Sequence, residues 1–365
     1  MQRRDLIRGL GLGAAAAATA ACSRRDGEAR VAGPGQRFEW KLVTTWPPNF
    51  PGLGTGAVEF ARRIEACSGG RLSIRVFGDG EFIPAFEVFD AVASGTAEMA
   101  HGAAYYWKGK IAAAPFFCAV PFGLTAQEMN AWLYHGGGLE LWQEAYAPFG
   151  LLPLPCGSSG CQMGGWFRRE LRSLADLQGL KMRMPGLGGE VLARAGATPV
   201  TLPGSEIFTA LQTGAIDATE WVGPYNDLAF GLHKAAKFYY YPGWHEPGST
   251  LELIVNRQAF DSLPADLQEI VRTTAAAIND RMLAEFTARN AEALQTLVNE
   301  HGVELRPFPP DVLARLQELS VEVLQEAAGR DALFARVLES WQTFRRRMDP
   351  YLAVAERAML NTRGG

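Results

Sequence analysis

Arg183 has an unusual sequence context. In the segment GLKMRMPGLGGE (residues 179–190) it ends a short apolar run, stands between two methionines and precedes Pro185. Such a setting favours an Arg that points into a cleft, where its planar guanidinium donates two parallel hydrogen bonds to one carboxylate. Two roles stay open from the residues alone: a clamp for a carboxylate ligand, or the partner of a structural Asp or Glu.

Glu220 and Trp221 end a second apolar stretch, AIDATEW (residues 215–221). A carboxylate facing an anionic ligand would repel it, and a cation between the two would remove that conflict. The side-chain oxygens of Gln162 and Glu220, with a backbone carbonyl near Trp221, form an all-oxygen set that suits Na⁺ or Ca²⁺ rather than zinc. The alternative is that Glu220 is a solvated strand end.

Further polar and aromatic residues follow other predicted strands. Tyr105 and Tyr106 lie in AAYYWKGK (residues 103–110), and His245 and Glu246 follow KFYYYPGW (residues 237–244). Ligands of doubly wound α/β domains bind at the carboxyl ends of strands, so these side chains are expected to meet in one cleft. One Arg is insufficient for micromolar binding, because a charged hydrogen bond supplies about 1.5–3 of the roughly 8 kcal/mol required.

The strand and helix pattern predicts two lobes. Alternating strands and helices begin near Phe38, pause at the Gly-rich stretch 157–165 and then restart, which is typical of two α/β units. The rhythm of the first unit predicts a mostly parallel sheet. The segment GSTLELIVNRQAFDSL returns the chain to the first unit, and helices dominate after Pro264. We expect lobe I at 38–156 and 251–308, lobe II at 157–250, and a C-terminal helical extension at 309–365.

The first residues are typical of an export signal. MQRRDLIRGLGLGAAAAATAAC has a basic start with Arg3 and Arg4, an apolar run and then small residues, which predicts a twin-arginine signal at 1–22. Residues 23–37 are expected to form a linker. Either Cys22 is lipidated or the chain is cleaved nearby, and both place the protein in the periplasm.

Composition excludes some function classes. The formal net charge of −4 over 365 residues gives no reason to expect a nucleic-acid partner. The five His residues are scattered and no nucleophile–base pair is placed, so we do not expect an enzyme. Cys156 and Cys161, in CGSSGC, either form a disulfide or remain thiols.

A glycine-rich segment invites a dinucleotide-binding interpretation. PGLGTG follows a predicted strand, but its spacing is G-x-G-x-G and Trp46, Pro47, Pro48 and Pro51 separate it from the strand. We expect a wide substrate loop here instead.

Three motifs together resemble a known family. LKMRMPG, LQTGAIDATEW and YYYPGWHEPG resemble, in order and spacing, the TRAP-transporter solute-binding proteins of the DctP type over about residues 38–345. CQMGGWFR, TEW and GWHEPG are most similar to the subgroup that binds 2-oxo or 2-hydroxy monocarboxylates with a metal ion. The resemblance implies a two-lobed periplasmic binding protein fold, class α/β, with long C-terminal helices.

The resemblance also implies roles for individual residues. Arg183, with Tyr105 or Tyr106, is expected to hold the ligand carboxylate, and Glu246 to form the far polar wall. The expected metal ligands are Gln162, Glu220 and Trp221, of which Gln162 and Trp221 also border the ligand. His245 stands where an aromatic residue is expected, and either donates to the ligand or only packs.

The function that follows is capture of a small carboxylate for the membrane subunits of a TRAP transporter, with Na⁺ or Ca²⁺ at the site. The amphipathic stretch after Pro310 is expected to exchange between the protomers of a homodimer, as in that subgroup. The alternatives are a periplasmic ligand sensor on the same scaffold, a binding protein for dicarboxylates, and an enzyme acting on a keto acid.

Overall fold

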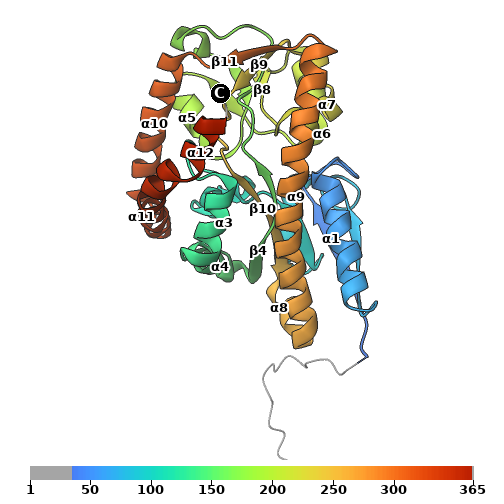
Figure 1. Ribbon diagram of the computed structural model, residues 1–365. Coiled ribbons are helices and arrows are strands. Elements are labelled where there is room, and N and C mark those ends of the chain that lie inside the picture. Colours follow the sequence, from blue (N-terminus) through green and yellow to red (C-terminus); the bar gives the residue numbers. More distant parts are fainter. Residues whose placement is uncertain (1–34, 364–365) are drawn as a thin grey trace, which may run out of the picture.

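The computed structural model of the protein describes residues 35–363. The predicted export signal, Cys22 and all but the last three linker residues therefore lie outside the described part. Two mixed β-sheets form the cores of two lobes, which lie one above the other in Figure 1. Within residues 35–363, no helix combines the length and the apolar character that crossing a membrane requires.

The first sheet has the strand order β2-β1-β3-β10-β4. Its strands are β1 (Phe38–Thr44), β2 (Leu72–Phe77), β3 (Met99–Gly102), β4 (Leu151–Gly160) and β10 (Ser249–Asn256). The connections contain α1 (Leu53–Cys67), η1 (Ala85–Glu87), α2 (Val88–Ala93), η2 (Ala104–Trp107), η3 (Ala114–Phe117), α3 (Ala126–His135), α4 (Gly138–Tyr146) and η4 (Ala147–Phe149), and α8 (Arg257–Ser262) follows β10.

The second sheet has the order β11-β9-β5-β8-β6-β7. Its strands are β5 (Gly165–Phe167), β6 (Lys181–Arg183), β7 (Thr198–Val200), β8 (Ala218–Thr219), β9 (Phe238–Tyr241) and β11 (Glu304–Pro307). Between them lie η5 (Leu174–Leu177), α5 (Gly186–Arg194), α6 (Gly204–Thr213), α7 (Pro224–Phe230) and η6 (Leu232–Lys234).

The expected element types are found, but the mostly parallel sheet expected for the first unit is instead mixed, with two parallel and two antiparallel pairings. The second sheet has three parallel and two antiparallel pairings. β10 pairs antiparallel with both β3 and β4, and β5 pairs antiparallel with both β8 and β9. Each antiparallel strand follows a crossing between the sheets, since β5 comes directly after β4 and β10 directly after β9. β11 lies within the range 251–308 expected for lobe I, yet it pairs with β9 in the second sheet.

Long helices cover the C-terminal part of the chain. They are α9 (Ala265–Asn299), α10 (Pro310–Ala328), α11 (Ala332–Val354) and α12 (Glu356–Arg363). The 35 residues of α9 contain neither Gly nor Pro, and a helix of that length extends about 50 Å. Figure 1 shows α9 running alongside both lobes, and it contacts α1, β4 and α7.

The glycines of PGLGTG are used for helix packing, so the expected wide substrate loop is only partly right. A Cβ on Gly56 would lie 2.3 Å from Met282 Cε, and one on Gly52, whose φ is 71°, would lie 2.7 Å from Phe286 Cε2. These glycines let α1 approach α9 closely. The preceding residues do face the other lobe, since the ring of Phe50 lies 6.2 Å from that of Trp221.

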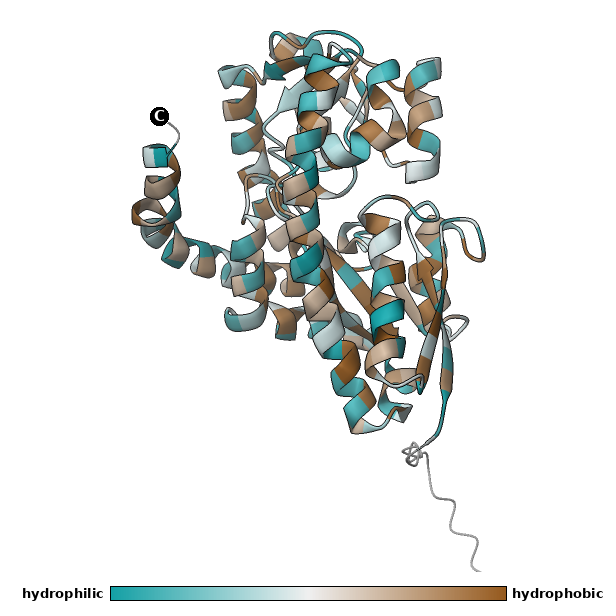
Figure 2. Cartoon of the chain, turned by 45° about the vertical axis from the view of Figure 1, so that its right-hand side comes forward, coloured by the Kyte–Doolittle hydropathy of each residue, from teal (hydrophilic) through white to brown (hydrophobic). Residues whose placement is uncertain are grey.

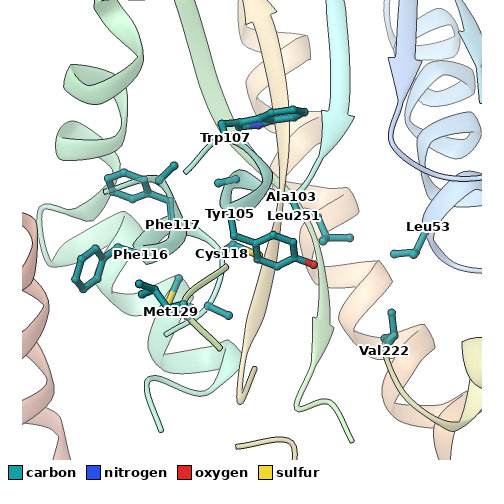
Figure 3. Packing of buried hydrophobic residues seen from close by; sticks show 14 of the residues in the cluster. Leu53, Ala103, Tyr105, Trp107, Phe116, Phe117, Cys118, Met129, Val222 and Leu251 are labelled. Atoms are coloured by element: carbon teal, nitrogen blue, oxygen red, sulfur yellow. The ribbon is translucent and has the colours of Figure 1, made fainter. Parts of the chain in front are cut away.

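Large aromatic side chains fill the interior of lobe I. Figure 3 shows Tyr105 and Trp107 near Phe117, Cys118 and Leu251. The rings of Trp132 and Trp142 stack on Phe117 at 5.9 and 5.3 Å. This packing fixes the backbone of η2, which presents Tyr105 and Tyr106 to the second lobe.

The cysteines do not form a disulfide among the described residues. Cys67, Cys118, Cys156 and Cys161 are all free thiols. Of the two alternatives that the sequence left open for Cys156 and Cys161, the structure therefore has the unpaired one.

Candidate functional site

Arg183 and Glu220 lie side by side because their strands are neighbours. β6 and β8 are parallel, and Arg183 is in register with Thr219, so Glu220 follows directly at the same edge of the sheet. Both side chains are completely buried and form an ion pair through Arg183 Nη1 and Glu220 Oε1. The expectation that polar residues converge at strand carboxyl ends is confirmed here.

The guanidinium of Arg183 has further partners. Its Nε donates to the carbonyl of Leu202 at 3.3 Å, and its Nη2 donates to the hydroxyl of Tyr106 at 3.2 Å. Its Cζ lies 5.1 Å from the ring centre of Trp221. Burial is the largest single influence and opposes the charge, but Glu220, Tyr106, Tyr105 and Glu246 together outweigh it and raise the pKa of Arg183 above its ordinary value. Arg183 is therefore a fixed cation inside the protein.

Tyr105 and Tyr106 reach the site from the opposite lobe. They belong to η2, and their rings meet edge to face at 4.7 Å. Burial is the main cause that raises the pKa of Tyr106 to about 12, so its hydroxyl stays protonated. The contact between Tyr106 and Arg183 therefore joins the two lobes at the site.

Gln162 is oriented by two serines. Its Nε2 donates to Ser159 Oγ at 3.0 Å and to Ser249 Oγ at 3.3 Å, and its backbone N–H donates to the carbonyl of Glu246 at 3.0 Å. These bonds use the donors of the amide and leave Oε1 as a buried acceptor without a partner. The sequence did not identify either serine, since neither lies in a distinctive motif.

Trp221 lies in an aromatic wall between the lobes. Its ring meets Trp46 at 6.1 Å and Phe230 at 5.2 Å. A Cβ on Gly204 would lie only 2.7 Å from Trp221 Cη2, so the start of α6 needs glycine at this contact. The carbonyl of Trp221 accepts no backbone hydrogen bond within residues 35–363 and remains available to a ligand.

His245 and Glu246 complete the cluster after β9. His245 Nε2 lies 3.5 Å from Glu220 Oε2, and Ser249 Oγ donates to Glu246 Oε2. Burial and then the nearby charge of Glu220 raise the pKa of Glu246 to about 7. Glu220, His245 and Glu246 each offer one atom within 4.8 Å of the others, a spacing that allows them to share a metal ion.

Asp227 is a supporting residue that the sequence did not reveal. Its carboxylate accepts from Trp166 Nε1 at 2.9 Å, from the Tyr239 hydroxyl at 2.6 Å and from the backbone N–H of Val222 at 3.3 Å. Burial raises the pKa of Asp227 to about 7. It fixes the backbone directly after Glu220 and Trp221, and only the folded arrangement shows this role.

Polar atoms without partners concentrate in this cluster. Of the twelve buried side-chain nitrogen and oxygen atoms that have no hydrogen-bond partner in the described part of the chain, five belong to four of these residues. They are Gln162 Oε1, Glu220 Oε2, Trp221 Nε1 and both ring nitrogens of His245. Buried polar groups are normally paired, so this concentration indicates a binding site. Two of the atoms are acceptors suited to a cation, and the indole N–H is a donor suited to an anion.

Comparison with known protein families gives one extensive match. The DctP family, described as bacterial extracellular solute-binding protein, family 7, matches residues 42–331. A monocarboxylate 2-oxoacid-binding periplasmic protein of Nostoc sp. is 44% identical over 359 residues, which cover 98% of this chain and 97% of the relative.

Two solved structures are similarly close. A TRAP periplasmic solute-binding protein of Pseudoalteromonas atlantica T6c, with bound sodium and pyruvate, is 43% identical with a TM-score of 0.87 and covers 89% of this chain and 99% of its own. A TRAP periplasmic solute-binding protein of Colwellia psychrerythraea, with bound calcium and pyruvate, is 41% identical with a TM-score of 0.87 and covers 90% and 100%.

Proposed function

Because the chain belongs to the DctP family of bacterial extracellular solute-binding proteins, we propose that it captures a small 2-oxo or 2-hydroxy monocarboxylate for a TRAP-type transporter. The Nostoc relative is named for 2-oxo acids, and both similar structures hold pyruvate. The observation that supports this most directly is the set of unpartnered buried polar atoms around Arg183 and Glu220.

Arg183 is the proposed clamp for the ligand carboxylate. It is a buried cation at a strand end, and Tyr106 supports it from the other lobe. Hydrogen bonds that involve a charged group are stronger than neutral ones, and a forked guanidinium matches a carboxylate in shape. The indole N–H of Trp221, which has no partner among the described residues, is a second donor for the ligand.

The donor set fits a cation such as the sodium and calcium of the two similar structures. Gln162 Oε1 and Glu220 Oε2 are buried acceptors without partners, and the two serines hold the Gln162 amide so that Oε1 stays free. A bound cation would supply positive charge between Glu220 and the oxygens of the ligand. Gln162, Glu220 and the carbonyl of Trp221 are the residues that would hold it.

We propose that Glu246 forms the polar wall of the ligand site. The short distances between Glu246, Glu220 and His245 favour a small ligand. Glu246 lies within the same 4.8 Å cluster as Glu220. A second carboxylate on the ligand would meet Glu246 as a like charge, which disfavours dicarboxylates.

Closure of the two lobes over the ligand accords with contacts across the cleft. Lys108 pairs with Glu190, and Ser205 Oγ donates to Asp79 Oδ2 at 2.8 Å. We propose that lobe I comprises residues 38–156 and 251–308 and that lobe II comprises residues 157–250. β11 is the exception, because it belongs to the sheet of lobe II. Hinge closure around a ligand is a common transition in binding proteins, and it presents a closed face to a partner.

The membrane subunits of a TRAP transporter are the proposed partners, and a homodimer is the proposed assembly. No residue of α12 is buried, and Figure 2 shows α12 projecting from the body of the molecule. Val354 and Met359 are 78% and 63% exposed. A second copy would cover this apolar tail, and light scattering on the purified protein measures the mass of the assembly.

Periplasmic export is also part of the proposal. Mass spectrometry of the mature protein tests whether Cys22 is lipidated.

Thermal shift assays test the proposed function. The protein is melted with pyruvate, lactate, longer 2-oxo acids and dicarboxylates, with and without a chelator, because a ligand that binds the folded form raises the melting temperature. The proposal requires a shift with at least one 2-oxo or 2-hydroxy monocarboxylate. A shift with dicarboxylates alone would discard the monocarboxylate assignment while leaving the family intact.

A further inference from the structure

A cavity of about 260 Å³ lies between the two lobes, outside the cluster of buried polar atoms. Lobe I contributes Tyr106 and Lys108 to its lining, and lobe II contributes Glu190 from α5. Gly109 and Ala193 also line the cavity and are both exposed. The cavity is therefore open to solvent at the mouth of the cleft.

Tyr106 connects this cavity to the proposed clamp. Its ring lines the cavity, and its hydroxyl accepts from Arg183 Nη2 at 3.2 Å. Arg183 is completely buried, whereas Tyr106 is only partly buried. The cavity therefore lies on the solvent side of Arg183, where a ligand would enter.

The charged groups of the cavity are few. Among the described residues that line it, Lys108 and Glu190 are the only ones with charged side chains. They form an ion pair from opposite lobes, and their side chains are 32% and 42% exposed. Within residues 35–363, Lys108 pairs with no other carboxylate. Opening of the lobes would separate the pair and leave the ammonium of Lys108 free.

The carboxylate of Glu190 occupies the place where Lys108 could hold the carboxylate of a ligand. The chain has a formal net charge of −4, so its average field repels an anion. A local positive charge at the entrance of a cleft offsets such repulsion and raises the rate of association. A lysine ammonium on a flexible stem suits a transient contact, whereas the planar fork of Arg183 suits a lasting one.

We infer that Lys108 forms an outer carboxylate subsite at the mouth of the cleft, and that Glu190 displaces the ligand from it as the lobes close. The ligand passes to Arg183, and the new ion pair stabilises the closed form because it exists only there. The inference rests on the proposed function, because it describes how the same carboxylate enters the site.

Stopped-flow fluorescence with pyruvate, in the presence of Ca²⁺, tests the subsite. The rings of Trp46 and Trp221 meet at 6.1 Å across the cleft, so closure should change their emission. At an ionic strength of about 10 mM, where charges act over about 30 Å, Lys108→Gln should slow association by about three- to tenfold. Lys108→Arg retains the charge and should associate at nearly the original rate. The difference between Lys108→Gln and the unmodified protein should disappear at about 1 M salt.

Glu190→Gln should have the opposite effect on association. It removes a negative charge from the mouth, so association should become faster, while dissociation also becomes faster because the closed form loses its ion pair. Exposed ion pairs contribute little, so the dissociation rate constant should rise by about 1.5- to fivefold. Lys108→Gln should raise it by the same factor, and the double variant should raise it no further.

Lys110 provides a matched control. It lies two residues after Lys108 and pairs with Asp90 of the same lobe at 2.9 Å. Lys110→Gln removes the same charge but no contact across the cleft, so it should change neither rate constant. The inference is overturned if Lys110→Gln slows association as much as Lys108→Gln does. It is also overturned if Lys108→Gln associates as fast as the unmodified protein, or if Glu190→Gln dissociates no faster.

Equilibrium titration with pyruvate keeps the subsite and the proposed function separate. If the unmodified protein binds pyruvate but Lys108→Gln has unchanged rate constants, the subsite is wrong and the transport function stands. If the unmodified protein binds no monocarboxylate, the proposed function fails and the subsite fails with it.

Discussion

Replacing Arg183 with Ala should weaken both the ligand complex and the protein itself. The guanidinium is completely buried, pairs with Glu220 and donates to Tyr106 and Leu202. Truncating one partner of a buried charge pair at a binding site costs about 2–5 kcal/mol, so pyruvate affinity should fall by about 30-fold or more. The variant also leaves Glu220 as an uncompensated buried charge, which should lower the free energy of unfolding by about 3–5 kcal/mol.

Calorimetry and urea denaturation measure the two effects, and two further variants separate them. Arg183→Lys keeps the positive charge but loses the fork, so it should recover more of the stability than of the affinity. Arg194→Ala removes a guanidinium that pairs with Glu326 at 2.6 Å on the surface, where both side chains are more than a third exposed. It should change stability by at most about 1 kcal/mol and affinity not at all. Pyruvate binding by Arg183→Ala within about threefold of the unmodified protein would refute the clamp.

Three further changes have defined outcomes. Glu220→Gln removes the charge that holds the cation, so pyruvate affinity should fall by at least about tenfold and the metal content should fall with it. Calorimetry measures the affinity and elemental analysis the metal content, and unchanged values of both would exclude the metal role of Glu220. Tyr106→Phe removes the partner of Arg183 Nη2, and should weaken pyruvate binding by about 0.5–1.5 kcal/mol in calorimetry, whereas tighter binding would contradict its support of Arg183. Glu252→Gln should flatten the pH dependence of stability, because burial raises the pKa of Glu252 from 4.5 to about 7. Protonation of Glu252 therefore stabilises the folded protein fully below pH 4.5, and this stabilisation is lost as the pH rises through 7. Urea denaturation of the ligand-free unmodified protein should show a loss of about 3 kcal/mol in the free energy of unfolding over this range. Parallel pH profiles of Glu252→Gln and the unmodified protein would show that Glu252 stays ionised.

The main features of the fold and the site were predictable from local sequence. Apolar runs bounded by glycines define β6 and β8, and placing Arg183 and Glu220 at their ends was sufficient to predict that they meet. The left-handed Gly214 that ends α6 was equally predictable, with a φ of 79°. These features depend on neighbours in sequence, and patterns of neighbouring residues express them directly.

The features that were not predictable depend on contacts between distant segments. Ser159 and Ser249 lie on β4 and β10, and their meeting at Gln162 follows from the antiparallel pairing of those strands. Asp227 reaches Val222, Trp166 and Tyr239 only in the folded lobe. The sequence left two roles open for Arg183, a clamp for a ligand carboxylate or the partner of a structural Asp or Glu. The two roles are not exclusive, because Arg183 pairs with Glu220, which is itself a predicted metal ligand at the site.

Calorimetric titration of the stripped protein with pyruvate and with acetate, before and after adding back Na⁺ or Ca²⁺, tests the central claim most directly. Acetate presents the same carboxylate to Arg183 but lacks the oxygen at C2 that the cation would hold together with Gln162 and Glu220. The account predicts that pyruvate binds at least about tenfold more tightly than acetate, and that the cation is required for this preference. Equal binding of the two acids, with no effect of the cation, would contradict it.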